Sequence, residues 1–136
     1  MDADQERTLL ESDLTDVVLG AFYSVYNELG AGFLESVYES ALAVEMELRK
    51  IRFLRQIELQ VIYRGRCVGE FRPDFLVGDR VIVEIKSVST LTNAHEAQLV
   101  NYLKATGARV GLLLSFGSRP EFRRRVLSSF YPHKSA

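Results

Sequence analysis

Three residues of the sequence have types and spacing that could do chemistry together: Asp74, Glu84 and Lys86, in the segment PDFLVGDRVIVEIK. If a three-residue loop at 78–80 joins two antiparallel strands, Asp74 lies directly opposite Glu84. Side chains alternate along a strand, so Lys86 shares the face of Glu84. A shift of one residue in register would destroy this arrangement. The pattern therefore predicts two carboxylates and an ammonium group on one patch of an otherwise apolar strand.

Such a patch needs a compensating partner, because charges are costly to bury in apolar surroundings. Mg²⁺ and Mn²⁺ accept oxygen ligands, with one or two carboxylates and retained waters. A cation of this kind could bridge Asp74 and Glu84, and Lys86 could orient a water or neutralise charge on a phosphate. The same spacing also fits a plain Glu84–Lys86 ion pair on a solvated strand face, with Asp74 as a turn residue after Pro73.

Two helical pairs accompany this patch in the sequence. Glu35 opens the second predicted helix, and Tyr38 lies one turn further on the same side. Gln98 and Tyr102 are four residues apart on a later helix and project together. Simpler interpretations stay open, since Glu35 also suits the positive end of a helix dipole and an amide with a phenol can be a polar rim.

The elements that must position these residues follow from hydrophobic periodicity. We expect two helices first, at 14–29, capped by Ser12 or Asp13, and at about 33–50. Three strands follow at 57–63, 67–77 and 81–86, joined by turns at 64–66 and 78–80. A helix then runs from Asn93, with Glu96 as its capping partner, to about Thr106, followed by a doubly buried strand at 109–116 and, after a break at 117–120, a short basic helix. This order predicts one α/β domain over residues 1–136, with a mixed sheet of about four strands flanked by helices and with frayed ends at 1–12 and 128–136.

Three segments resemble the motifs of a known group of proteins. The stretch Gly32-Phe33-Leu34-Glu35-Ser36-Val37-Tyr38 resembles the signature of the GxxExxY protein family, a small branch of the PD-(D/E)XK nuclease superfamily. The superfamily's own motif is similar to Pro73-Asp74 followed by Glu84-Ile85-Lys86. The stretch from Gln98 to Tyr102 resembles the QxxxY element of RecB-like nucleases. Together the motifs and elements extend over about residues 14–127.

The resemblance implies a restriction-endonuclease-like core and a role for each matching position. Asp74 and Glu84 would bind Mg²⁺ or Mn²⁺ together with the main-chain carbonyl of Ile85, Glu35 would bind it directly or through water, Lys86 would be the catalytic lysine, and Gln98 and Tyr102 would steady that lysine or contact substrate phosphate. We also expect Tyr38 beside Glu35 to contact substrate.

The function expected is a metal-dependent nuclease that hydrolyses DNA or RNA with metal-activated water and without intrinsic sequence specificity. A nuclease-fold module that binds nucleic acid or a protein partner without turnover is the alternative. A small-molecule hydrolase or redox enzyme is disfavoured, because the sequence has no phosphate-cradling glycine loop or nucleophile elbow and has two histidines. One cysteine and no long apolar run favour a cytoplasmic protein, and a homodimer is possible.

Charge is unevenly distributed along the chain. Residues 1–47 carry eleven acids and one base, and residues 48–136 carry sixteen bases and seven acids, although the formal net charge is −1. Basic residues that could contact a phosphate backbone are Arg64, Arg66, Arg72, Arg119 and the run Arg123-Arg124-Arg125, the last of which could instead be a solvated helix face. The balance is therefore compatible with local, salt-sensitive nucleic-acid binding.

Overall fold

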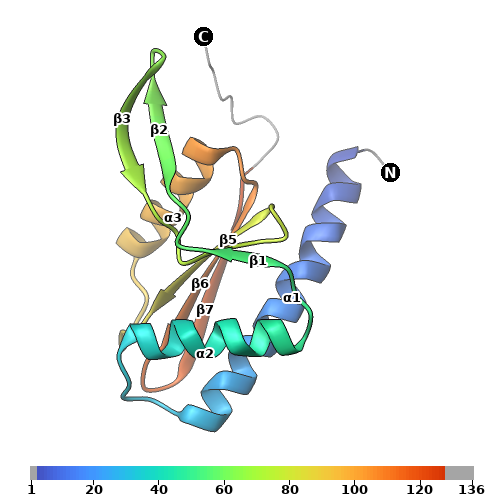
Figure 1. Cartoon of the computed structure of the whole chain (residues 1–136), viewed down its shortest axis with the longest axis vertical. Coiled ribbons are helices and arrows are strands. Elements are labelled where there is room, and N and C mark those ends of the chain that lie inside the picture. Colours follow the sequence, from blue (N-terminus) through green and yellow to red (C-terminus); the bar gives the residue numbers. More distant parts are fainter. Residues whose placement is uncertain (1–2, 128–136) are drawn as a thin grey trace.

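The fold is a mixed sheet with helices on both faces (Figure 1). The computed structural model describes residues 3–127, with side chains from residue 11 onward. The elements are α1 (Ala3–Leu29), α2 (Glu35–Leu48), β1 (Phe53–Arg55), β2 (Leu59–Tyr63), β3 (Arg66–Phe71), β4 (Phe75–Val77), β5 (Val81–Lys86), α3 (Asn93–Thr106), β6 (Val110–Phe116) and β7 (Pro120–Val126). The described strands form a five-stranded sheet in the order β1-β4-β5-β6-β7 and a separate two-stranded ribbon, β2-β3. The predicted α/β class with a mixed sheet is confirmed, with more strands than expected.

Strand β6 lies in the interior of the sheet, between β5 and β7. It runs parallel to β5 and antiparallel to β7, and every residue from Val110 to Phe116 is buried. Uninterrupted burial is typical of a strand covered on both faces. The expected doubly buried strand is therefore confirmed, and it is not an edge of the sheet.

The two faces of the sheet carry separate apolar cores. Val81, Val83 and Ile85 of β5 belong to the core under α1 and α2, whereas Ile82 belongs to the core under α3. Because side chains alternate, Glu84 and Lys86 lie on the α3 face. The predicted register of the β4–β5 hairpin is confirmed, since Val77 pairs with Val81 across the turn.

Several predicted elements are placed differently. Helix α1 begins at Ala3, well before the expected cap at Ser12 or Asp13, so the segment expected to fray is helical from residue 3. The strand expected at 67–77 is broken between β3 and β4, and β1 was not predicted. The break falls at Arg72-Pro73, where proline cannot donate to a strand ladder. Helix α3 is capped by Thr92 with His95, in place of the expected Asn93 and Glu96.

The expected basic helix after Pro120 is wrong, because residues 120–126 form β7. The exposed edge of β6 needs a hydrogen-bonding partner, and β7 supplies it in antiparallel register, with Leu113 opposite Arg123. Arg123 and Arg125 point to the α3 side and form ion pairs with Glu96. The expected fraying of residues 128–136 lies outside the described part of the chain.

Within the described part of the chain, no helix is both long and apolar enough to cross a membrane.

Candidate active site

The β4–β5 hairpin brings Asp74 and Glu84 together, as the register predicted. The backbone N–H of Asp74 donates to Oε1 of Glu84 at 3.3 Å, and Oδ2 of Asp74 accepts from the backbone N–H of Ile85 at 2.7 Å. Lys86 is close enough to Glu84 for its charge to act on the carboxylate. The two carboxylates and the lysine of the motif therefore meet where β5 ends.

Burial dominates the electrostatics of the two carboxylates. Desolvation raises the pKa of Glu84 from 4.5 to about 8, the charge of Asp74 raises it further, and the charge of Lys86 lowers it. Desolvation also raises the pKa of Asp74 from 3.8 to about 6, against the lowering effect of its hydrogen bond from Ile85. The site thus disfavours two negative charges and would be stabilised by a cation.

Glu39, a residue that the sequence reasoning missed, reaches the same place. Its charge and hydrogen bonding raise the pKa of Asp74, and the side-chain amide of Gln56 donates to Oδ1 of Asp74 and to both carboxylate oxygens of Glu39, each at 3.1 Å. Arg55 forms an ion pair with Glu39 at 3.1 Å. Glu39 lies one helical turn after Glu35, so helical spacing made it a second candidate without showing which of the two acids faces Asp74.

Glu35 reaches the end of β5 by a different route. Its Oε2 accepts from the backbone N–H of Ser87 at 3.1 Å, directly after Lys86. Among the described residues, however, no three His, Cys, Asp or Glu side chains form a group that could hold a metal ion. The structure therefore brings Asp74, Glu84 and Glu39 into electrostatic contact and places Glu35 beside the backbone of the strand end.

Helix α3 contributes Tyr102 to the site. Burial, followed by the charges of Glu84 and Asp74, raises the pKa of the Tyr102 phenol, which is therefore neutral at ordinary pH. Its ring stacks on Phe71 with centroids 3.9 Å apart and planes at 7°. Gln98, one turn earlier, is exposed, and its side chain makes no hydrogen bond to the described residues.

Tyr38 does not have the substrate-facing position that was expected. It is completely buried, its hydroxyl donates to the carbonyl of Gly30 at 2.5 Å and accepts from the N–H of Phe33 at 3.1 Å, and its ring stacks on Phe116. The tyrosine of the motif therefore fastens the loop before α2 to the core. This correction follows from packing, which the motif spacing does not report.

The basic residues expected near a phosphate backbone are dispersed. Arg72 lies in the break between β3 and β4, not on a strand face beside Asp74, and pairs with Glu58 at 3.0 Å. Arg64 and Arg66 are at the tip of the β2–β3 ribbon, which projects from the body of the molecule in Figure 1. Local contacts to phosphate thus remain available on the ribbon, whereas Arg123 and Arg125 are engaged by Glu96.

Comparison with solved structures shows the fold. The crystal structure of SSO0001 matches with a TM-score of 0.55 and 17% sequence identity, over 68% of this chain and 50% of that one. The alkaline exonuclease LHK-Exo from Laribacter hongkongensis matches with a TM-score of 0.50 and 15% identity, over 65% of this chain and 53% of that one. The matched part of this chain thus corresponds to about half the length of either protein. A search of curated protein sequences found no match.

A family comparison covers nearly the whole described chain. The sequence profile of the PD-(D/E)XK nuclease superfamily matches residues 12–126, a range that includes α2, the β4–β5 hairpin and α3. Asp74, Glu84 and Lys86, which carry the acid-acid-lysine pattern of that name, meet at one strand end, with Tyr102 on the adjoining helix. The chain belongs to the PD-(D/E)XK nuclease superfamily.

Proposed function

We propose that this protein is a nuclease that hydrolyses phosphodiester bonds in DNA or RNA with the help of Mg²⁺ or Mn²⁺. The observation that carries the proposal is the pair of half-buried carboxylates, Asp74 and Glu84, beside Lys86 at the end of β5. Membership of the superfamily and the fold shared with an alkaline exonuclease support the same reaction class. Strongly perturbed pKa values at such a cluster are typical of functional sites.

The residues present fit a hard divalent cation. Both side chains offer oxygen ligands, and burial is the main cause of their raised pKa values, so a bound cation would stabilise their charged forms. Asp74 and Glu84 would hold the ion together with the main-chain carbonyl of Ile85. The N–H of Ile85 donates to Asp74, and in an antiparallel pair the N–H and the carbonyl of one residue point to the same side of the strand. Mg²⁺ accepts two carboxylates with waters in its remaining positions, so Glu35 could act through water. When bound, the cation would supply positive charge opposite the phosphate oxygens.

The chain's own residues have separate roles in this proposal. Lys86 would hold its ammonium group beside the reacting phosphate, where it offsets developing negative charge and orients the attacking water. Tyr102 would donate from its neutral phenol to a phosphate oxygen. Gln56 would keep Asp74 in place, because its amide connects that carboxylate to Glu39.

Sequence-independent contacts are the form of binding that the described surface favours. Arg64 and Arg66 at the ribbon tip could contact phosphates, which positions nucleic acid without reading bases. We therefore propose a nuclease that selects ends or structures, or that is directed by a partner. The finer placement in the GxxExxY family stays a prediction on residues 32–38.

A binding module without turnover is the second candidate. The observation in its favour is that no third acid joins Asp74 and Glu84 in metal-holding geometry among the described residues. In this alternative, the raised pKa values would reflect a pair that is protonated and not metal-bound. The two candidates predict different outcomes in one experiment.

The test is cleavage of labelled single-stranded, duplex and branched DNA and RNA with Mg²⁺, with Mn²⁺ and with EDTA. We expect cation-dependent cleavage that is lost in Asp74→Asn and Lys86→Ala and retained in Glu47→Gln, a control at an exposed position on α2. Titration calorimetry should show Mn²⁺ binding that Asp74→Asn weakens. Nucleic-acid binding without cleavage or Mn²⁺ binding would support the module, and cleavage that persists in both variants would indicate a contaminating enzyme.

A further inference from the structure

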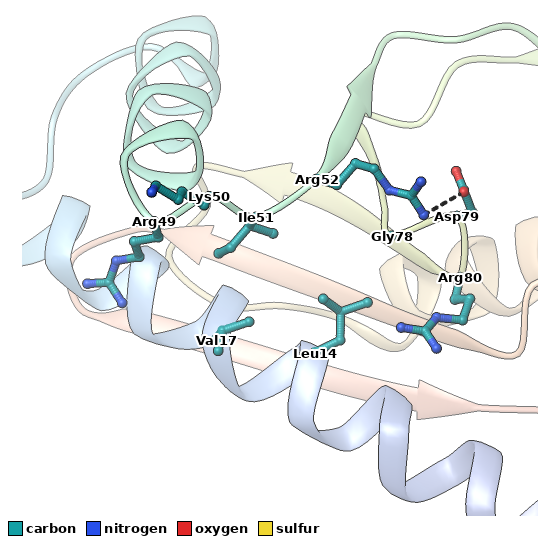
Figure 2. A pocket seen from close by; sticks show the side chains of 9 residues that line it. All are labelled: Leu14, Val17, Arg49, Lys50, Ile51, Arg52, Gly78, Asp79 and Arg80. Carbon is teal, nitrogen blue, oxygen red and sulfur yellow. Dashed lines mark hydrogen bonds and ion pairs between the residues drawn. The ribbon is translucent and has the colours of Figure 1, made fainter.

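A cleft lies at the opposite end of the β4–β5 hairpin from Asp74 and Glu84. Figure 2 shows it between α1, the segment that follows α2, and the turn Gly78–Arg80. Its volume is about 710 Å³, within the roughly 300–1,000 Å³ typical of sites for small molecules. The cleft is therefore large enough for a ligand of that class.

The lining of the cleft is strongly cationic. Arg49, Lys50, Arg52 and Arg80 contribute positive charge, and Asp79 is the acidic side chain among the lining residues. Arg52 pairs with Asp79 at 2.9 Å, and Arg49 pairs with Glu45 at 2.7 Å. Lys50 and Arg80 form no ion pair within the described part of the chain. The cleft thus keeps uncompensated positive charge that an anion could meet.

Arg80 has unused hydrogen-bonding capacity. Its Nε is shielded from solvent and has no hydrogen-bond partner among the described residues. In Figure 2 the guanidinium group extends from the turn toward Leu14 on α1. Beyond it, Glu11 and Arg109 line an adjoining hollow of about 300 Å³ that shares Arg80. Because an unsatisfied shielded donor is unfavourable, an acceptor brought by a ligand would be a net gain.

Apolar side chains lie between the cationic ends of the cleft. Leu14 and Val17 on α1 face Ile51 across it (Figure 2), and the side chain of Val17 is 45% exposed. At the far end, a Cβ atom on Gly20 would lie 3.0 Å from Nη1 of Arg49, so the glycine leaves room for that guanidinium against α1. The cleft therefore combines an apolar wall with guanidinium groups at its ends.

We propose that this cleft binds a phosphate group carried on an apolar ring system, that is, a nucleoside monophosphate or the 5′-phosphorylated end of a strand. Guanidinium groups pair with phosphate oxygens through two parallel hydrogen bonds, and the apolar wall would cover the base. Arg80 and Glu84 are four positions apart in the sequence, about 13 Å at 3.3 Å per residue. The inference is thus independent of the proposed nuclease activity, because the ligand would occupy a different end of the hairpin.

The test is calorimetric titration of the full chain with nucleoside monophosphates in EDTA, which keeps divalent cations away from Asp74 and Glu84. We expect saturable binding of one ligand per chain, weakened by added salt because the contacts are ionic. Parallel titrations use the unphosphorylated nucleoside, inorganic phosphate and oligonucleotides with 5′-phosphate or 5′-hydroxyl ends. Tighter binding of free monophosphates would identify the ligand as a nucleotide. Tighter binding of the 5′-phosphorylated oligonucleotide would identify it as the end of a strand.

Two variants locate the binding. Arg80→Gln should weaken binding about tenfold, as expected for loss of one charged hydrogen bond. Val17→Glu, at an exposed helical position, should weaken binding similarly, because it places a carboxylate in the cleft while every basic side chain stays unchanged. If Arg80→Gln fails to fold, Val17→Glu tests the proposal in its place. Glu47→Gln, at an exposed position on α2 outside the cleft, is the control and should bind normally. Lys86→Ala tests whether the ligand occupies the carboxylate site instead.

Three outcomes would overturn the proposal. The first is no saturable binding of any phosphorylated ligand with a Kd below about 1 mM. The second is equal affinity for nucleosides with and without the phosphate. The third is loss of binding in Lys86→Ala with retention in Val17→Glu, which would place the ligand at the carboxylate site.

Discussion

The two ends of the β4–β5 hairpin carry opposite charge under different conditions. At one end, Asp74 and Glu84 repel each other in a half-buried position, and burial raises both pKa values. At the other, Arg52 pairs with Asp79 where both side chains are largely exposed. Between them the strands are apolar and buried. The difference teaches that two like charges interact strongly where burial excludes water, whereas an ion pair exposed to water contributes little.

The largest difference expected between variants at the two ends of the hairpin is in the rate of catalysis. Lys86→Ala should reduce the rate of phosphodiester cleavage by about 10²–10³-fold, the usual effect of removing one group that stabilises transition-state charge. On a substrate with 5′-hydroxyl ends, Arg80→Gln, at the basic end, should leave the rate within about twofold, since it is about 13 Å from Glu84 along the strand. Single-turnover kinetics with enzyme in excess measures both. Equal losses in the two variants would contradict the separation of the two ends.

The next effect is on stability as a function of pH. The pKa of Glu84 is about 8 in the folded protein and 4.5 in a model peptide, so the folded state binds the proton more tightly. Stability from this group is therefore complete below about pH 4.5 and is lost as the pH rises through about 8. This pH-dependent loss of stability is at most about 5 kcal/mol, and in EDTA it should be absent from Glu84→Gln. Urea unfolding at several pH values measures it, and parallel profiles for the variant and the parent would refute the assignment.

A smaller effect distinguishes the two turns that close the hairpins. Gly78 has φ of +58°, and a Cβ atom there would lie 2.8 Å from Cδ2 of Leu14. Gly65 in the ribbon turn has φ of +78°, but its Cβ would meet nothing within 4 Å. Each substitution by Ala should destabilise by about 1–2 kcal/mol for the left-handed backbone, and Gly78→Ala by more. Thermal unfolding compares them, and a larger loss at Gly65 would contradict the packing of the 78–80 turn on α1.

The smallest effect concerns the ion pair at the basic end. Arg52→Gln should change the free energy of unfolding by at most about 1 kcal/mol, because both partners are mostly exposed. The change should decrease further in high salt. Chemical unfolding at two salt concentrations measures it. A decrease of several kcal/mol in the free energy of unfolding would show that this end is as well shielded from water as the carboxylate end.

The register of β4–β5 could be predicted because loop length and side-chain alternation define it. That register alone placed Asp74 opposite Glu84. Glu39 could not be selected over Glu35 from the sequence, since which side of α2 faces Asp74 depends on packing against the sheet. The strand at 120–126 was mistaken for a helix because local sequence does not report that β6 still needs a partner. Tyr38 was misassigned for a similar reason, since a motif residue can serve the core.

Strands β1 and β4 pair directly, with Arg55 opposite Phe75, and the backbone N–H of Gln56 donates to the carbonyl of Asp74 at 3.2 Å. The stretch between them, including the β2–β3 ribbon, therefore leaves and rejoins the body at adjacent points. The ribbon therefore has the position of an insertion, because β1 and β4 could still pair if a short loop replaced it. Residues 57–70 could accordingly be exchanged for another loop that carries a new substrate-contacting surface, with Phe71 kept for its stacking on Tyr102.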